Sequence, residues 1–451
     1  MSKTYRPYEP DQILLLPPSL KDWLAEGHLA HFISDLVEES LDLSEITEVY
    51  EREDRGYPPY HPVMMTKVLL YAYCIGLPSS RKIAKRLVED VAFRVLAANS
   101  TPDFRTISDF RKRHLAVVND LFVQVLKLCR KAGMAKLGHV ALDGTKMKAN
   151  ASKHKSMSYG RMNKEEARLA AEVAEFLRQA DEADAREDAE YGPDKTGDEL
   201  PAELAYREGR LKKIREAKEA LEREAREEAE AKNRQAEAGK RGGGKSPEVE
   251  AKPREKAQKN FTDPESRIMP SGSEKGSFLQ GYNCQAVVDG KHQVIVACDA
   301  TQDTNDSHQA ERMLKQVKAN TGKAPSKASM DAGYASEDNI VAVEAMGTDA
   351  FIAASRKKHG DVAPAAPRGR IPNALSVMDR MRRKLLTKEG RAVYAKRKEI
   401  VEPVFGQIKQ SRGFRQFLLR SLAKVKGEWA LICLTHNLLK LWRQTGLQAT
   451  G

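Results

Sequence analysis

Three acidic residues far apart in the sequence are the candidate catalytic groups. Asp143 follows the apolar residues 139–142, Asp331 follows residues 326–330, and Glu402 lies in a charged segment with helical spacing. No His or Cys cluster accompanies them, and carboxylate oxygens alone favour Mg²⁺ or Mn²⁺ over zinc. We expect the three to bind two such ions, which could activate an attacking oxygen and stabilise the leaving oxygen at a phosphodiester.

Each of these signals has an ordinary structural explanation when taken alone. Asp143 precedes Gly144, and Asp-Gly is a common turn. The DAGY segment at Asp331 could be a turn from strand to helix, and a glutamate on a charged helix is usually just solvated. The chemistry is indicated by the three residues in this order.

The elements that would position them follow from apolar patterning. We expect a short strand at 139–142, a hairpin at 283–301 that turns at Gly290-Lys291, and then helix, strand, helix and strand at 308–321, 326–331, 336–346 and 349–355. A basic loop at 355–373 and two long helices complete the chain. This order predicts an α/β RNase H-like core with a mixed five-stranded sheet. There the first and fourth strands are neighbours, and a long helix can carry Glu402 across both aspartates.

Residues 1–136 are predicted to form an all-α module, because apolar residues recur at helical spacing in 23–36, 63–75 and 115–129. Ser79 or Ser80 could cap one helix there, and Thr106 or Ser108 another. Two basic segments suggest a DNA reader like a helix-turn-helix, although a helical bundle with a charged face fits equally well. The candidate DNA-binding residues are Arg81, Lys82, Lys85, Arg86, Arg111, Lys112 and Arg113.

Residues 137–152 would supply the first strand, and 261–451 the rest of the catalytic domain. Between them, residues 153–260 are dominated by Ala, Glu, Lys and Arg, which are strong helix formers, with few aromatic residues. We expect a charged helical hairpin or coiled coil that does no chemistry and ends in a basic tether at 238–256. Asp263, just after it, is either a turn residue or a support for the site, and Asp306 and His308 are expected to cap a helix.

The bulk composition is consistent with a polyanionic partner. The 451 residues include 76 Lys and Arg against 64 Asp and Glu, a net charge of +12. Such a balance favours nucleic acid, although a solvated basic surface is the simpler alternative. The five cysteines form no CxxC pair, and the start carries only LLL followed by PP. We therefore expect free thiols, no signal peptide, no membrane span and a cytoplasmic, nucleoid-associated protein.

The chain resembles the DDE transposases of bacterial insertion sequences. The resemblance lies in VALDGTKMKAN, SMDAGYASEDN, FTDPESRIM, SFLQGYNCQAVVD and the amino-terminal PYHPVMMTKVLLYAYCIGLPSSRKIAKRLVEDVAFRVL. It is similar to the branch with a Tyr–Arg–Glu–Lys signature, matched here by Tyr394, Arg397, Glu402 and Lys409. The interval from Arg397 to Glu402 is one residue longer than in that signature.

The resemblance implies a role for each group. Asp143, Asp331 and Glu402 would bind the divalent ions, with first water and then a freed DNA 3′-hydroxyl as the nucleophile. Arg397 and Lys409 would hold phosphates of the element's end, and Tyr394 would contact the backbone or pack. The partners would be double-stranded DNA, as terminal inverted repeats and target, and a second copy of the chain in a synaptic dimer.

Two other interpretations remain open from the sequence. One is an RNase H-like nuclease that cleaves without joining. The other is a non-catalytic DNA-binding protein that uses the helical module and the coiled coil as a bridge. The three carboxylates argue against the second, because binding alone does not need them.

Overall fold

The computed structural model describes residues 19–52, 58–191, 202–238, 251–271, 276–354, 365–369, 372 and 374–449. Within these ranges, only the backbone is described at 180–191, 202–204, 235–238 and 445–449. Most of the expected tether at 238–256 and of the expected loop at 355–373 lies outside the described residues.

A mixed sheet forms the centre of the molecule. Its order is β4-β5-β1-β7-β8, with β6 also paired to β5. The antiparallel strands are β1 (His139–Lys148), β4 (Arg267–Pro270), β5 (Phe278–Asp289) and β6 (Ile295–Thr301), and β7 (Lys327–Met330) and β8 (Asp349–Ile352) add a parallel part. The expectation of five strands was wrong by one, because β4 and β6 pair with successive halves of β5 and share one edge.

The first strand is longer than the sequence pattern indicated. It was expected to end before Asp143, but β1 continues to Lys148 because β5 pairs with it from Val140 through Lys148. Asp143 therefore lies in mid-strand opposite Ala286 rather than in an Asp-Gly turn. The hairpin and the alternating helices and strands after it were confirmed.

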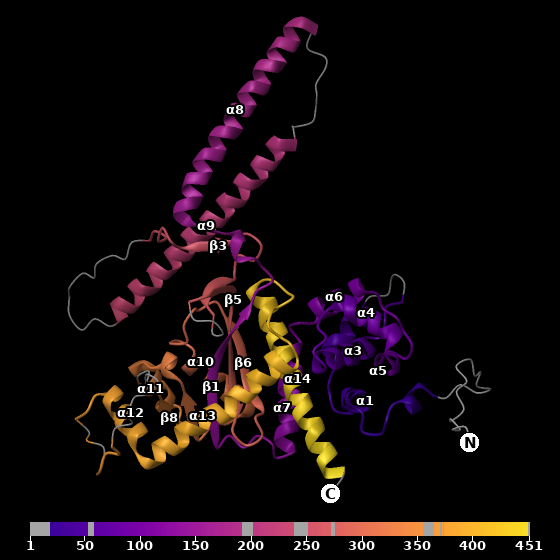
Figure 1. Cartoon of the computed structure of the whole chain (residues 1–451), viewed down its shortest axis with the longest axis vertical. Coiled ribbons are helices and arrows are strands. Elements are labelled where there is room, and N and C mark those ends of the chain that lie inside the picture. The colour runs from indigo at the N-terminus through magenta and orange to yellow at the C-terminus, as the bar shows by residue number, and fades with distance from the viewer. Residues whose placement is uncertain are drawn as a thin grey trace, which may run out of the picture.

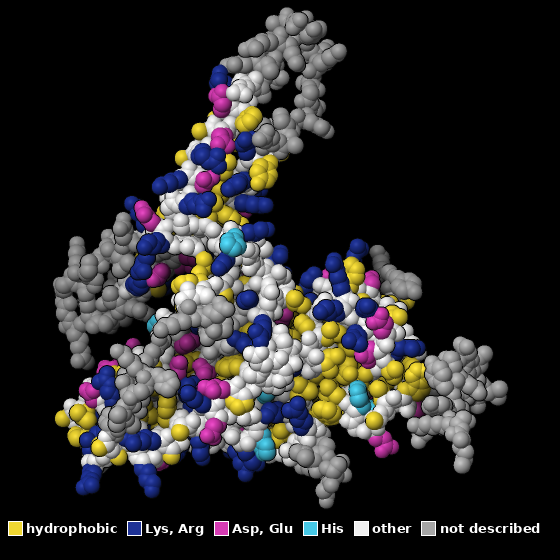
Figure 2. Space-filling view, in the orientation of Figure 1, with side chains coloured by type: hydrophobic (Ala, Val, Ile, Leu, Met, Phe, Trp, Pro, Cys, Tyr) yellow, Lys and Arg dark blue, Asp and Glu magenta, His cyan; other side chains and the backbone are white. Residues whose placement is uncertain are grey.

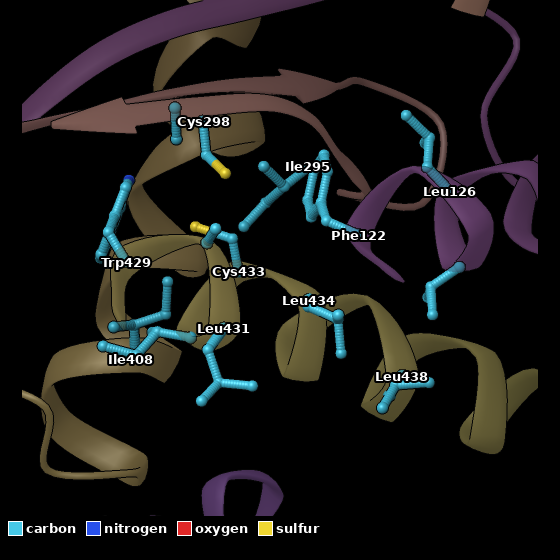
Figure 3. Close-up of a cluster of buried hydrophobic side chains, with 14 of the residues drawn as sticks. Phe122, Leu126, Ile295, Cys298, Ile408, Trp429, Leu431, Cys433, Leu434 and Leu438 are labelled. Atoms are coloured by element: carbon cyan, nitrogen blue, oxygen red, sulfur yellow. The ribbon is translucent and has the colours of Figure 1, made fainter. Parts of the chain in front are cut away.

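The helices α10 (Ala310–Thr321), α11 (Glu337–Ala345), α12 (Val377–Leu386), α13 (Lys388–Gly406) and α14 (Leu422–Ala449) complete the core. Helix α14 packs against β6 and against α7 (Val118–Lys131). Figure 3 shows this contact, where Cys433 of α14 faces Cys298 of β6 and Ile295 of β6 lies beside Phe122 of α7. Trp429 is completely buried, and its indole N–H donates to the carbonyl of Gln285 at 3.0 Å.

The amino-terminal region is helical, as expected. It contains η1 (Leu20–Trp23), α1 (Leu29–Glu39), α2 (Ser44–Glu51), α3 (Pro62–Cys74), α4 (Ser80–Glu89), α5 (Val91–Leu96) and α6 (Phe104–Arg113). Ser79 occupies the N-cap of α4 without a side-chain hydrogen bond, whereas Asp103 caps α6 in place of Thr106 or Ser108. One continuous hydrophobic cluster joins these helices, α7 and the sheet.

The charged insertion forms an arm that projects from the sheet (Figure 1). After η2 (Lys153–Lys155), strands β2 (Ser156–Ser158) and β3 (Gln258–Asn260) pair at its base, and α8 (Tyr159–Tyr191) lies against α9 (Ala202–Ala238). A hydrophobic cluster separate from the main core holds the two helices together, with Met162, Leu169, Ile214 and Leu221 among its members. The expected helical hairpin is therefore present.

Two further expectations concern the cysteines and membrane-spanning helices. The five cysteines are all free and buried. Within the described part of the chain, no helix combines the length and the apolar character that a bilayer crossing needs.

Candidate active site

The pairing of β1 with β7 brings the two aspartates together. The strands are parallel, and Leu142 is opposite Met330. Asp143 and Asp331 are the residues that directly follow this pair along the two chain segments, so they occupy neighbouring positions at the same end of β7. Asp331 ends β7 and begins η3 (Ala332–Tyr334), where its Oδ1 accepts a hydrogen bond from the Gly333 amide at 2.8 Å.

Asp143 carries a negative charge that its surroundings only partly balance. Arg397 of α13 donates to its Oδ2 at 2.8 Å, and the Gly144 amide donates to its Oδ1 at 2.8 Å. Burial nevertheless raises the pKa of Asp143 to about 6, with Arg397 opposing the rise and the nearby Asp331 adding to it. Desolvation thus outweighs the ion pair, and another cation beside Asp143 would relieve the carboxylate.

A third acidic side chain, Asp306, lies beside Asp331. A Cβ built on Gly333 would be 3.0 Å from Asp331 Oδ1 and 3.3 Å from Asp306 Oδ2, so the two carboxylates flank this glycine. The amides of Asn283 and Gln285 each donate to Asp306 Oδ1 at 2.7 Å. The expectation that Asp306 or His308 caps α10 was wrong, because Gln309 is the N-cap and makes no side-chain cap.

Lys146 completes this cluster from β1. Its Nζ lies 3.6 Å from Asp306 Oδ1, and burial lowers the pKa of the ammonium. Sequence reasoning overlooked the group of Asn283, Gln285, Asp306 and Lys146. One signal could have revealed it: the amides of Asn283 and Gln285 alternate on one face of β5, which is buried over most of its length, and buried polar groups need partners.

The structure does not bring Glu402 to the aspartates. Its side chain is exposed and has no hydrogen-bond or ion-pair partner among the described residues. Helix α13 itself packs on β1 and β7. Pro403 follows Glu402 directly and has no N–H for the carbonyl of Glu399, which accepts from Gln293 Nε2 at 2.9 Å instead. The helical ladder is therefore interrupted beside Glu402, and a π-turn at Gln407–Ser411 follows.

The other residues of the expected signature lie closer to the centre. Arg397 is 9% exposed and contacts Asp143, so its guanidinium faces the Asp143 carboxylate rather than open solvent. Tyr394 is half-buried, with its ring 5.9 Å from the Arg397 guanidinium. Lys409 donates to the carbonyl of Lys146 at 2.9 Å, which places it on the strand that carries Asp143.

The donor groups fit hard divalent cations. The aspartates supply only oxygen ligands, and a cation beside Asp143 would oppose the desolvation that raises its pKa to about 6. Among the described residues, no three His, Cys, Asp or Glu side chains are already arranged as a metal cage. Asp143 and Asp331 could supply two of the ligands, and a further ligand would have to come from another side chain, from water or from DNA.

Neighbouring buried groups support the strands. Asp263 is 1% exposed and accepts from the Tyr282 hydroxyl at 2.9 Å and from the Ser421 amide at 3.2 Å, so it ties β5 to the start of α14. His436 is 1% exposed and lies between Gln407 Oε1 and the carbonyl of Gln293, each at 3.0 Å. Both residues belong to the scaffold.

The basic residues of the amino-terminal region fall into two groups. Arg81, Lys82, Lys85 and Arg86 are exposed on α4, and Lys112 and Arg113 lie at the end of α6. Arg111 was expected to contact DNA but is 5% exposed. Its guanidinium donates to Tyr73 Oη at 3.1 Å and to the carbonyl of Pro78 at 2.6 Å, so it holds α6 against α3.

Comparison with known proteins gives two matches to protein families. Residues 18–113 match the Transposase domain (DUF772), and residues 252–438 match the Transposase DDE domain. No curated protein and no solved structure matches the chain. The DDE match covers β4 to β8 and the helices up to α14, and it implies an RNase H-like fold. The two matches support the assignment of this chain as an insertion-sequence transposase, an enzyme of the polynucleotidyl transferase class.

Proposed function

We propose that the protein binds the terminal inverted repeats of its element and catalyses both cleavage and strand transfer through Asp143, Asp331 and Glu402. The observation that carries this proposal is the register of β1 and β7, which aligns Asp143 with Asp331. The raised pKa of Asp143 supports a cationic partner at this position. Two Mg²⁺ or Mn²⁺ ions would supply charge stabilisation at the attacking and leaving oxygens of a phosphodiester.

The protein's own groups have separate tasks in this reaction. Asp143 and Asp331 would hold the cations, and Arg397 would keep the Asp143 carboxylate oriented through its 2.8 Å contact. Lys146 lies 3.6 Å from Asp306 and is a further positive charge in this cluster. It would stabilise the negative charge of a scissile phosphate bound there. The chemistry would take place beside the sheet, where α13 packs on β1 and β7.

Glu402 would supply the third carboxylate when DNA and cations are bound. It follows the family signature, and the interrupted ladder at Pro403 makes this stretch of α13 the one able to adjust. Asp306 is the second candidate for this role, because it already lies beside Asp331. The two are distinguished by comparing Glu402→Gln with Asp306→Asn in the same cleavage reaction.

The exposed cations of α4 would contribute to binding the element's ends. Arg81, Lys82, Lys85 and Arg86 extend along one short helix, and within the described part of the chain their ion pairs are the long surface contacts Lys85–Glu89 at 3.5 Å and Arg86–Asp90 at 3.6 Å. Such exposed pairs are weak and can be exchanged for phosphate. Two copies of the chain would act on the two ends of one element.

The test is a joining assay with the full-length protein, Mg²⁺ and a duplex that carries the repeat flanking the gene. We expect cleavage at the repeat and transfer of the freed 3′-end into a second duplex, and we expect Asp331→Asn to abolish both. Cleavage without joining would indicate that the protein is a nuclease rather than a transposase. DNA binding without either reaction would support a non-catalytic bridge.

A further inference from the structure

The base of the arm carries a basic groove that the proposed chemistry does not use. It lies between η2, β2, the first turn of α8 and the first half of α9. Besides Ser156, the polar side chains that line it are those of His154, Lys155, Arg161, Tyr206, Arg210 and Lys213, and no Asp or Glu lines it among the described residues. All six side chains are exposed, and Tyr206 is 68% exposed.

The cations of this groove differ from most others on the arm. Arg168, Arg178, Lys218 and Lys232 are all paired with glutamates at 2.9 Å or less. Lys155, Arg161, Arg210 and Lys213, in contrast, make no ion pair among the described residues.

A nearby glutamate does not neutralise the groove. The Arg168 hydrogen bond, with weaker help from Arg210 and Arg161, lowers the pKa of Glu165. The Glu165 carboxylate is paired with Arg168 at 2.8 Å, so it does not engage the groove cations directly. A concave surface with several cations and no acid in its lining is complementary to a polyanion.

We propose that this groove binds the phosphate backbone of the DNA whose end lies at Asp143, so that the arm acts as a clamp on the element's own duplex. The proposal rests on the proposed function, because it takes the DNA to be the substrate of Asp143 and Asp331. Tyr206 adds a hydroxyl that can donate to phosphate, alongside the Arg and Lys contacts. Figure 2 shows Lys and Arg side chains gathered along the arm from its base upward.

The distance between groove and site fits one continuous duplex. His154 follows Asp143 by 11 residues, which can span at most about 40 Å of extended chain. Duplex DNA rises about 3.4 Å per base pair, so the groove can meet phosphates no farther than about 12 base pairs from the cleaved bond. A duplex that stops well short of the groove would still fill the catalytic site but would not reach these cations.

The experiment compares the full-length protein with a groove variant that carries Lys155→Gln, Arg161→Gln, Arg210→Gln and Lys213→Gln. The matched control carries Arg168→Gln, Arg178→Gln, Lys232→Gln and Arg234→Gln, which removes equal charge from paired positions of the same arm. Affinity for the flanking repeat is measured against salt, on a duplex of about 20 base pairs and on one of about 6 base pairs beside the cleavage site. Helicity and thermal unfolding of each variant report on folding.

On the long duplex we expect the groove variant to bind at least about tenfold more weakly at about 0.1 M salt, with the slope of log affinity against log salt reduced by about 0.9 for each phosphate that it no longer binds. The control should change much less, and on the short duplex the groove variant should differ less from the parent than it does on the long duplex. Equal binding of groove variant and parent on the long duplex would overturn the clamp while leaving the transposase intact. A change in oligomeric state without a change in DNA affinity would assign the groove to a second copy of the chain instead. A parent protein that neither binds nor cleaves the repeat would overturn the proposed function, and the clamp with it.

Discussion

Asp143→Asn should change how the stability of the cation-free protein depends on pH. The Asp143 side chain is only about one-fifth exposed, and desolvation raises its pKa from an ordinary 3.8 to about 6 in the folded protein. The unfolded chain therefore releases this proton at a lower pH than the folded chain. The stabilisation from the protonated form is complete below about pH 4 and is lost as pH rises through about 6.

The size of the effect follows from the shift. Each pKa unit corresponds to about 1.4 kcal/mol, so a rise from 3.8 to about 6 costs the folded state about 3 kcal/mol above pH 6. Asparagine cannot ionise and does not incur this cost. Arg397 loses its partner in the variant, but the guanidinium stays charged throughout this range and adds an offset that does not vary with pH.

Thermal unfolding of both proteins in chelator, from about pH 4 to about pH 8, measures the difference. The variant's Tm minus the parent's Tm should rise by about 5 °C between about pH 4 and about pH 7 and then stay level. Adding Mg²⁺ at neutral pH should raise the Tm of the parent more than that of the variant, because the cation meets the Asp143 charge. A Tm difference that stays flat across the pH range would refute the burial of an under-compensated carboxylate at this position.

Three further changes test the ion pair, the basic helix and the arm. Arg397→Gln removes the 2.8 Å ion pair, so the pH at which Mg²⁺-dependent cleavage is half-maximal should move upward from that of the parent, and an unchanged profile would contradict the pairing with Asp143. Replacing the four exposed cations of α4 by Gln should weaken repeat binding and flatten its salt dependence, with Tm unchanged. Arg111→Gln should instead lower Tm by several degrees, because its hydrogen-bond partners are buried. Equal weakening of binding in both variants would argue against separating DNA-binding cations from a structural Arg111. The arm can be replaced by a short Gly/Ser linker that joins Gly160 to Glu255, because the Gly160 amide donates to the Glu255 carbonyl at 3.1 Å. Circular dichroism should show that the remaining core is folded, and global unfolding would show that the arm is integral to the fold.

The positions of the two aspartates were predictable because they depend on strand patterning and chain order. Asp143 follows the apolar residues 139–142 and Asp331 follows the short strand at 326–330, and parallel pairing places those two strands side by side. The end of β1 was not predictable from its own residues. Gly144, Thr145 and Lys146 have no apolar alternation, and they are held in the strand by pairing with β5. Tertiary pairing decided that boundary against local preference.

The polar side of the site escaped prediction for a related reason. Asp306 resembles a helix cap in the sequence because it is an acidic residue shortly before α10, yet the N-cap is Gln309 and the Asp306 carboxylate accepts from the amides of Asn283 and Gln285. Arg111 was assigned to DNA from its place in a basic run, although helical periodicity gives such a run a buried side as well as an exposed one. Contacts between distant segments determine both outcomes.

Glu402 is the residue that we propose completes the site with Asp143 and Asp331, and the glutamate one turn earlier on α13 provides its control. Glu399 is also exposed, but it lies beside Gly138 and His139 at the start of β1, whereas Lys409, two turns after Glu402, reaches Lys146. The decisive measurement is strand transfer of a pre-cleaved repeat end in Mg²⁺ by Glu402→Gln and Glu399→Gln, with repeat binding measured in parallel. We expect that Glu402→Gln binds the repeat but transfers no strand, while Glu399→Gln keeps substantial transfer. Full transfer by Glu402→Gln, or its loss in Glu399→Gln alone, would contradict the assignment of the third carboxylate.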